Sequence, residues 1–253
     1  MNHKRNIITS LALLVLGLIQ TSPAATIGIG TAFGSFFDKS GIKADALTEG
    51  GVSIGFFTVT LPTSSSVASV TSYSQFVSAY GYQDVRTLLD ANGNAPVYTG
   101  SNTWDFGLGW TGATLTVPSS PSNAPAAAYN HNDLLTTFTA GSTTGTALYA
   151  VAFNKGNYAN GYAGSTQWAL VTATAFGLTG NDWIYPTSSE NIQLSQINVA
   201  GEVLAGSDGA NVVITGVGVN DVVMTDLVPE PSTSALMMIG ACGLVAMRRL
   251  RKV

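Results

Sequence analysis

The chain has 253 residues, of which only 9% are charged, and its formal net charge is −4. Residues 25–228 hold four basic and 13 acidic residues, a net charge of −9, so this segment lacks the basic patch that nucleic-acid binding requires and no nucleic-acid partner is expected. The single cysteine, Cys242, lies outside this segment, which excludes disulfides and cysteine-based metal sites from it.

Residues 1–24 have the three parts of a secretory signal peptide. A basic start is followed by a short apolar run over residues 7–19. Ser22 and Ala24 then place small residues where a signal peptidase reads the chain, which predicts cleavage between Ala24 and Ala25. An uncleaved membrane anchor is the alternative, but the shortness of the apolar run favours the signal peptide.

The predicted body, residues 25–226, contains several runs that are typical of strands. They are rich in β-branched and aromatic residues and are separated by segments rich in Gly, Asn, Ser and Pro. These runs are residues 26–33, 52–61, 113–117, 147–153, 167–176 and 211–224. The run over 147–153 is nearly all apolar, as expected of a strand buried on both faces, whereas Thr172 and Thr174 indicate a strand with one wetter face.

Two segments have helical features. Residues 72–90 begin with a capping-box pattern at Ser72 and Gln75 and continue with apolar residues at helical spacing. Residues 132–138 form a second, shorter helical pattern. Many short strands with little helix predict an all-β fold, a jelly-roll-like β-sandwich with one or two short helices. A signal helix at the N-terminus and a hydrophobic helix at the C-terminus complete the prediction.

The last 25 residues differ from the body. Pro229, Glu230 and Pro231 form a segment that enters neither helix nor sheet, because the two prolines lack backbone donors and fix φ. The apolar run from Ala235 to Met247 predicts a helix about 20 Å long, a marginal transmembrane span. A basic cluster follows, which the positive-inside rule places in the cytoplasm: Arg248, Arg249, Arg251 and Lys252.

This order of Pro-Glu-Pro, short apolar helix and arginine-rich end resembles the PEP-CTERM sorting signal of Gram-negative bacteria. The resemblance covers residues 228–253, and we assign the sorting signal to residues 227–253. It implies that Pro229, Glu230 and Pro231 are the motif that a membrane-embedded exosortase recognises. It also implies export through the Sec machinery, transient anchoring in the inner membrane by the tail, and cleavage near the motif. Release or attachment at the cell surface would follow, commonly in bacteria that make exopolysaccharide. A plain C-terminal membrane anchor is the alternative.

The body offers no recognisable catalytic set. Its one histidine, His131, lies in an Asn-rich turn, no Gly-x-Ser-x-Gly sequence occurs, and no spacing pairs two carboxylates for glycoside hydrolysis. One histidine without cysteine also argues against zinc. Oxygen-rich segments at residues 207–211 and 220–221 are the best places for Ca²⁺, although ordinary β-turns explain them better. We therefore expect no enzymatic activity and no cofactor.

Tyr158, Tyr162 and Trp183 are the candidate glycan contacts, because aromatic rings in Gly- and Asn-rich segments can stack on sugars. The two tyrosines, in the sequence NYANGY, are expected at the surface, whereas core positions are the favoured alternative for Trp168 and Trp183. The first functional hypothesis is a non-enzymatic surface or matrix protein, sorted by its tail and associated with exopolysaccharide or biofilm. The second is a carbohydrate-binding module that ties exopolysaccharide to the cell surface. An enzyme acting on polysaccharide is the third.

Overall fold

The computed structural model of the chain describes most of the predicted body. The residues described are 24–30, 35–43, 50–99, 113–119, 121–123, 127–129, 135–137, 146–173, 183–185, 189–193, 203–209, 213–215, 217–219 and 221–228. The predicted signal peptide up to residue 23 and the predicted sorting signal from residue 229 lie outside them, together with both predicted terminal helices. Among the described residues, no helix is long and apolar enough to cross a membrane.

Strands form two larger sheets. The first has the strand order β12 (Val203–Ala205), β10 (Gln167–Val171), β9 (Tyr149–Phe153), β3 (Gly51–Phe57) and β4 (Tyr82–Asp84), and β15 (Thr225–Asp226) also pairs with β10. The second has the order β11 (Ser189–Gln193), β1 (Ala24–Gly30), β6 (Ala113–Pro118) and β5 (Val97–Thr99). The β1–β11 pairing is parallel, and the other strand pairs of these two sheets are antiparallel.

Smaller elements complete the described fold. One small sheet has the order β13 (Ser207–Asp208), β14 (Val222–Val223) and β2 (Phe36–Phe37), and another pairs β7 (Ala127–Tyr129) with β8 (Leu135–Thr137). The helices are α2 (Ser64–Val67), α3 (Tyr73–Tyr80) and the 3₁₀ turns η2 (Val85–Thr87) and η4 (Tyr158–Asn160).

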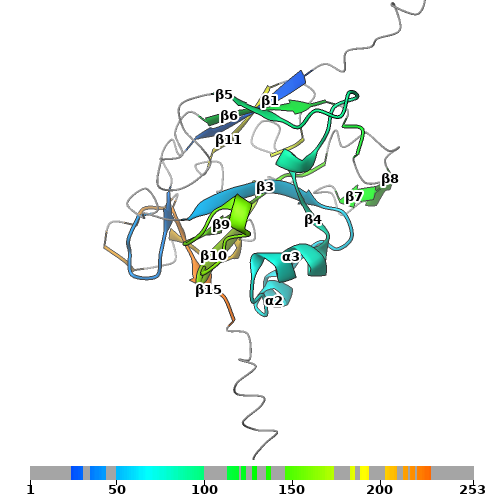
Figure 1. Cartoon of the computed structure of the whole chain (residues 1–253). Coiled ribbons are helices and arrows are strands. Elements are labelled where there is room, and N and C mark those ends of the chain that lie inside the picture. The colour runs from blue at the N-terminus through cyan, green and yellow to red at the C-terminus, as the bar shows by residue number, and fades with distance from the viewer. Residues whose placement is uncertain are drawn as a thin grey trace, which may run out of the picture.

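The two larger sheets and the helices form three layers. In Figure 1, β1, β6 and β11 lie above β3, while α2 and α3 lie below it. The sheet that contains β3 is therefore covered on both faces, which explains why all seven residues of β3 are buried.

Alternate residues of the central strands belong to two different cores, one on each face of the sheet. Successive side chains of a strand point to opposite faces of its sheet. Val52, Ile54 and Phe56 of β3 belong to the core between the two sheets, where they meet Ile27 of β1 and Leu115 of β6. The central strands β9 and β10 contribute small residues to this core: Ala150, Ala152 and Ala169.

The core between the central sheet and the helices is aromatic. Phe57 of β3 lies with its ring centroid 4.6 Å from that of Tyr149, and Phe76 of α3 lies 5.3 Å from Trp168. Phe153 of β9 belongs to the same core. Edge-to-face aromatic pairs add about 0.5–1.5 kcal/mol each beyond their buried area. These contacts fix α3 against the sheet.

The mostly-strand class and several element positions are confirmed. Five of the predicted runs overlap observed strands, which are β1, β3, β6, β9 and β10. The run over 147–153 is fully buried, as expected. The wetter face expected at Thr172 is wrong, because this residue is buried and its hydroxyl donates to the Leu148 carbonyl at 2.8 Å. The jelly-roll-like strand order stays a prediction.

The predicted helix over residues 72–90 is half right. Ser72 caps α3 by accepting a hydrogen bond from the Gln75 N–H at 3.3 Å. The helix stops at Gly81, whose φ of 61° is the left-handed conformation of a helix C-cap. The chain then continues as β4, because Tyr82 and Asp84 pair with β3.

Two other predicted elements are wrong in their described parts. Leu135–Thr137 is strand β8, not helix, in keeping with the β-branched side chains of two of its three residues. The continuous strand predicted over 211–224 is interrupted by turns at 215 and 219 and reappears only as Val222–Val223.

Replacing Ser72 by Ala removes the side-chain cap of α3. We expect this change to lower the free energy of unfolding by about 1 kcal/mol, measured by urea denaturation of the processed protein. Ser78→Ala is the control, because Ser78 is exposed in the same helix and alanine favours helix. Equal destabilisation by the two substitutions would contradict the capping role.

Candidate functional site

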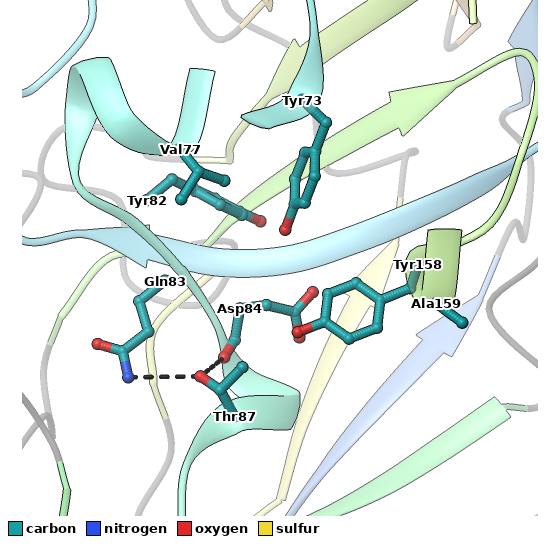
Figure 2. A pocket seen from close by; sticks show the side chains of 8 residues that line it. All are labelled: Tyr73, Val77, Tyr82, Gln83, Asp84, Thr87, Tyr158 and Ala159. Carbon is teal, nitrogen blue, oxygen red and sulfur yellow. Dashed lines mark hydrogen bonds between the residues drawn. The ribbon is translucent and has the colours of Figure 1, made fainter. Parts of the chain in front are cut away.

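A cavity of about 420 Å³ opens beside α3, β4, η2 and η4. Figure 2 shows its lining side chains, with Tyr73 descending from α3 and Tyr158 reaching in from η4. The lining residues are Tyr73, Val77, Tyr82, Gln83, Asp84, Thr87, Tyr158 and Ala159. Aromatic and apolar surface with a few polar groups is the usual composition of a small-molecule site.

A buried ion pair lies beside the cavity. The Asp84 carboxylate accepts from the Arg86 backbone N–H at 2.7 Å and from its Nε at 2.8 Å through Oδ1. Through Oδ2 it accepts from Arg86 Nη2 at 2.6 Å and from Ser53 Oγ at 2.5 Å. The two charged side chains are only 2% and 11% exposed. These four bonds fill the acceptor positions of an ionised carboxylate.

Arg86 connects the ion pair to its surroundings. Its guanidinium lies 3.6 Å from the centroid of the Tyr158 ring, a cation–π contact. Nη2 also donates to the Tyr162 hydroxyl at 3.3 Å and to the Val52 carbonyl of β3 at 3.4 Å. One side chain of η2 therefore holds β3 and the segment around η4 together.

Three tyrosines surround the ion pair in an environment that keeps them neutral. Burial raises the pKa of Tyr82, and the negative charge of Asp84 raises it further. The same two causes, burial first, raise the pKa of Tyr73 well above its usual value. Burial also raises the pKa of Tyr162, with the positive charge of Arg86 opposing it.

Tyr162 has a left-handed backbone conformation, with φ of 56°, that residues other than glycine rarely adopt. Its ring stacks on Phe153 with centroids 4.6 Å apart and meets the Tyr73 ring edge-on at 5.0 Å. Its N–H donates to the Asn157 carbonyl at 2.9 Å. These contacts hold the residue in place despite the cost of the conformation, which is of order 1–3 kcal/mol.

The three predicted glycan contacts do not come together. Tyr158 is half-buried and lines the cavity. The expectation that Tyr162 is exposed is wrong, because only 3% of it is accessible and its ring is stacked in the aromatic core. Trp183 is fully buried in the other core, on the opposite face of the central sheet. The alternative of a core position is confirmed for both Trp168 and Trp183.

Sequence reasoning missed Asp84, Arg86 and Gln83 as parts of one site. Arg86 is the only arginine between residues 25 and 228, and it stands two positions after an aspartate. That spacing is a signal, because an aspartate that caps a helical turn accepts a hydrogen bond from the backbone N–H two residues later, as Asp84 does from Arg86. The helix predicted over this stretch concealed it, since residues two apart on a helix point in different directions.

In the described parts of the two segments that we considered for Ca²⁺, Ser207–Asp208 forms strand β13 and Asp221 belongs to a turn. The Asp221 carboxylate accepts from the Ser35 N–H at 2.8 Å and from the Gly218 N–H at 2.5 Å. The Gly209 N–H donates to the Asp221 carbonyl at 2.7 Å. Among the residues that the structure describes, no group of three or more His, Cys, Asp or Glu side chains could hold a metal ion. His131 lies outside the described residues.

The predicted signal-peptide cleavage falls within strand β1, and the sorting motif begins within the described end of the body. Ala24 is the first residue of β1, and Ala25 beside it is buried. At the other end, the Leu227 N–H donates to the Thr166 carbonyl at 2.8 Å and the Val228 N–H donates to the Val70 carbonyl at 2.9 Å. The body is thus held up to the residue before the Pro-Glu-Pro sequence. The motif, the apolar run and the basic cluster from residue 229 onward lie outside the described residues.

Residues 227–252 match the family model of the PEP-CTERM protein-sorting motif. The chain carries a PEP-CTERM sorting motif. The prediction made from its last residues is therefore confirmed. The motif marks the chain as an exosortase target and implies export and sorting to the cell surface. No curated protein and no solved structure matches the chain.

Removing the buried carboxylate should be far more costly than removing an exposed one. Asp84→Ala leaves the Arg86 charge buried without its partner, which lowers the free energy of unfolding by about 3–5 kcal/mol. Asp226→Ala is the matched control, because it breaks the Lys39–Asp226 pair, whose side chains are 50% and 59% exposed. The control should lose at most about 1 kcal/mol. Urea denaturation measures both, and similar losses would contradict a buried, structural pair.

The buried tyrosines predict a loss of stability at high pH. Below pH 10.0, their usual pKa, Tyr73, Tyr82 and Tyr162 are protonated in both the folded and the unfolded protein. Above it only the unfolded state releases these protons, so the free energy of unfolding falls as pH rises. Denaturation at several alkaline pH values should show this slope, and Tyr73→Phe should reduce it. Reversible ionisation of all nine tyrosines near pH 10.0 in the folded protein would contradict it.

Proposed function

We propose that this chain is an exported, non-enzymatic surface or extracellular-matrix protein that an exosortase sorts and cleaves at its C-terminal signal. The sorting motif over residues 227–252 is the observation that carries the proposal. The body reaches Val228 in a fixed conformation, so cleavage beyond that residue removes no contact that the structure describes. Before cleavage, the apolar run from Ala235 to Met247 holds the protein in the inner membrane.

The absence of enzymatic activity is supported by the state of Asp84. Glycoside hydrolysis uses two carboxyl groups, one to donate a proton and one to act as base or nucleophile. Asp84 is the one carboxylate among the described residues that line the cavity, and its acceptor positions are already filled. A carboxylate whose acceptor positions are all filled is suited to a structural role and poorly suited to proton transfer.

A carbohydrate-binding module that ties exopolysaccharide to the cell surface is the second candidate. The cavity with Tyr158 at its rim favours it over an enzyme acting on polysaccharide, because binding needs no reactive group. Both candidates associate the protein with exopolysaccharide and biofilm, and they differ in whether the body itself holds the sugar.

The intact mass of the protein from its host tests the processing. We expect the surface and medium fractions to contain a species that lacks residues 1–24 and the segment beyond the Pro-Glu-Pro sequence. Substituting Pro229, Glu230 and Pro231 by alanine should leave the longer form in the membrane fraction. Val97→Ala, at an exposed position of β5, is the control and should be processed normally.

A mass that still contains Ala235 to Met247 in every fraction would contradict exosortase processing.

Incubation of the processed protein with the host's own exopolysaccharide tests the proposal that the protein has no enzymatic activity. The polymer's size distribution and reducing ends should stay unchanged. Shortened chains would mean an enzyme instead.

A further inference from the structure

We propose that the cavity between α3, β4 and η4 binds one neutral sugar unit of an extracellular polysaccharide. The inference rests on the proposed function, since it names the ligand class of the body of an exported matrix protein. It rests on the charge balance, the hydrogen-bonding groups and the rigidity of this one site.

The charge balance of the cavity excludes charged ligands. Asp84 is the one charged side chain among the described lining residues, and its ion pair with Arg86 neutralises it. An anionic sugar needs a cation to pair with, but the guanidinium is already committed to Asp84, Tyr162 and the Tyr158 ring. The net charge of −9 over residues 25–228 also repels anionic polymers.

The polar groups of the cavity are suited to hydroxyl groups. Gln83 makes one long side-chain hydrogen bond, from Nε2 to Thr87 Oγ1 at 3.4 Å, and its Oε1 accepts none within the described part of the chain. Among the described residues, the Tyr73 hydroxyl has one hydrogen-bond contact, a long one of 3.4 Å to Ser53 Oγ. An amide and a phenol that retain bonding capacity beside a cavity offer both donors and acceptors, which a polyhydroxylated ligand satisfies.

The apolar part of the cavity is suited to the C–H face of a sugar ring. Tyr73 and Tyr158 border it as two aromatic rings, and Val77 and Ala159 add small apolar surface. The electron-rich face of an aromatic ring attracts the weakly positive C–H groups of a pyranose. A volume of about 420 Å³ lies within the usual range for small-ligand sites and is large enough for one sugar unit.

The site is also held in place before any ligand arrives. The Arg86 contact fixes the Tyr158 ring, and the capping box between Asn157 and Asn160 fixes η4, from which that ring projects. A rigid site loses little conformational entropy on binding.

Affinity electrophoresis of the processed protein tests the inference. The probes are dextran, laminarin, galactomannan and the neutral fraction of the host's own exopolysaccharide, with alginate as the anionic comparison. We expect retardation in at least one neutral gel and none in alginate. Absence of retardation in every neutral gel, or retardation in alginate alone, would overturn the inference.

Variants locate the binding in the cavity. Gln83→Ala removes a side-chain amide that lines the cavity and makes one long hydrogen bond, to Thr87. This change should weaken binding about 3- to 10-fold. Tyr158→Ala should weaken it at least about tenfold. Val97→Ala on the other sheet should leave it unchanged. Thermal unfolding is measured for each, and Gln83→Ala decides the matter should Tyr158→Ala fail to fold.

Wild-type affinity for both cavity variants would place the sugar site elsewhere and overturn the inference. The failure of the proposed function has a different signature. A protein that binds neutral glycan but keeps its tail and never reaches the surface would sink the sorting proposal alone. A protein that is processed and located at the surface but binds no neutral glycan would sink only this inference.

Discussion

The buried ion pair of Asp84 and Arg86 is the interaction on which the surrounding structure depends. Burying either ion alone costs several kcal/mol, so the pair is tolerated only where further hydrogen bonds complete it. Ser53 from β3 supplies one, and Tyr162 accepts from the guanidinium. The strand β3, the segment β4–η2 and the loop of η4 are thereby held to one another. The cavity lies beside β4, η2 and η4, and α3 lines it as well.

The hydrogen bonds to Asp84 explain how the site can be polar and yet lack a reactive group. A carboxylate with four accepted hydrogen bonds has no position left for a substrate proton. What remains available around it is the Gln83 amide, the Tyr73 phenol and aromatic surface, a set that favours recognition over reaction. The sorting motif matched over residues 227–252 includes none of the residues that line the cavity.

Patterns that arise from local physics were predictable from the sequence. The nearly all-apolar, buried run over 147–153, the cap at Ser72 and the Pro-Glu-Pro sorting motif each depend on neighbours within a few residues. The site was not predictable in this way. Arg86 lies 76 residues from Tyr162 in the chain, and Ser53 lies 31 residues from Asp84. Gly81 ends the helix α3, and tertiary pairing with β3 then overrides the helical spacing of the residues that follow.

A double-mutant cycle on Asp84 and Arg86 tests the central claim most directly. The free energy of unfolding is compared for the wild type, Asp84→Leu, Arg86→Met and the double substitution. If the pair holds this region together, each single change leaves a buried charge without its partner, and the double change costs less than their sum by about 1.5–3 kcal/mol. Costs that simply add would contradict the account, because two side chains that do not depend on one another cannot organise the strands and loop around them.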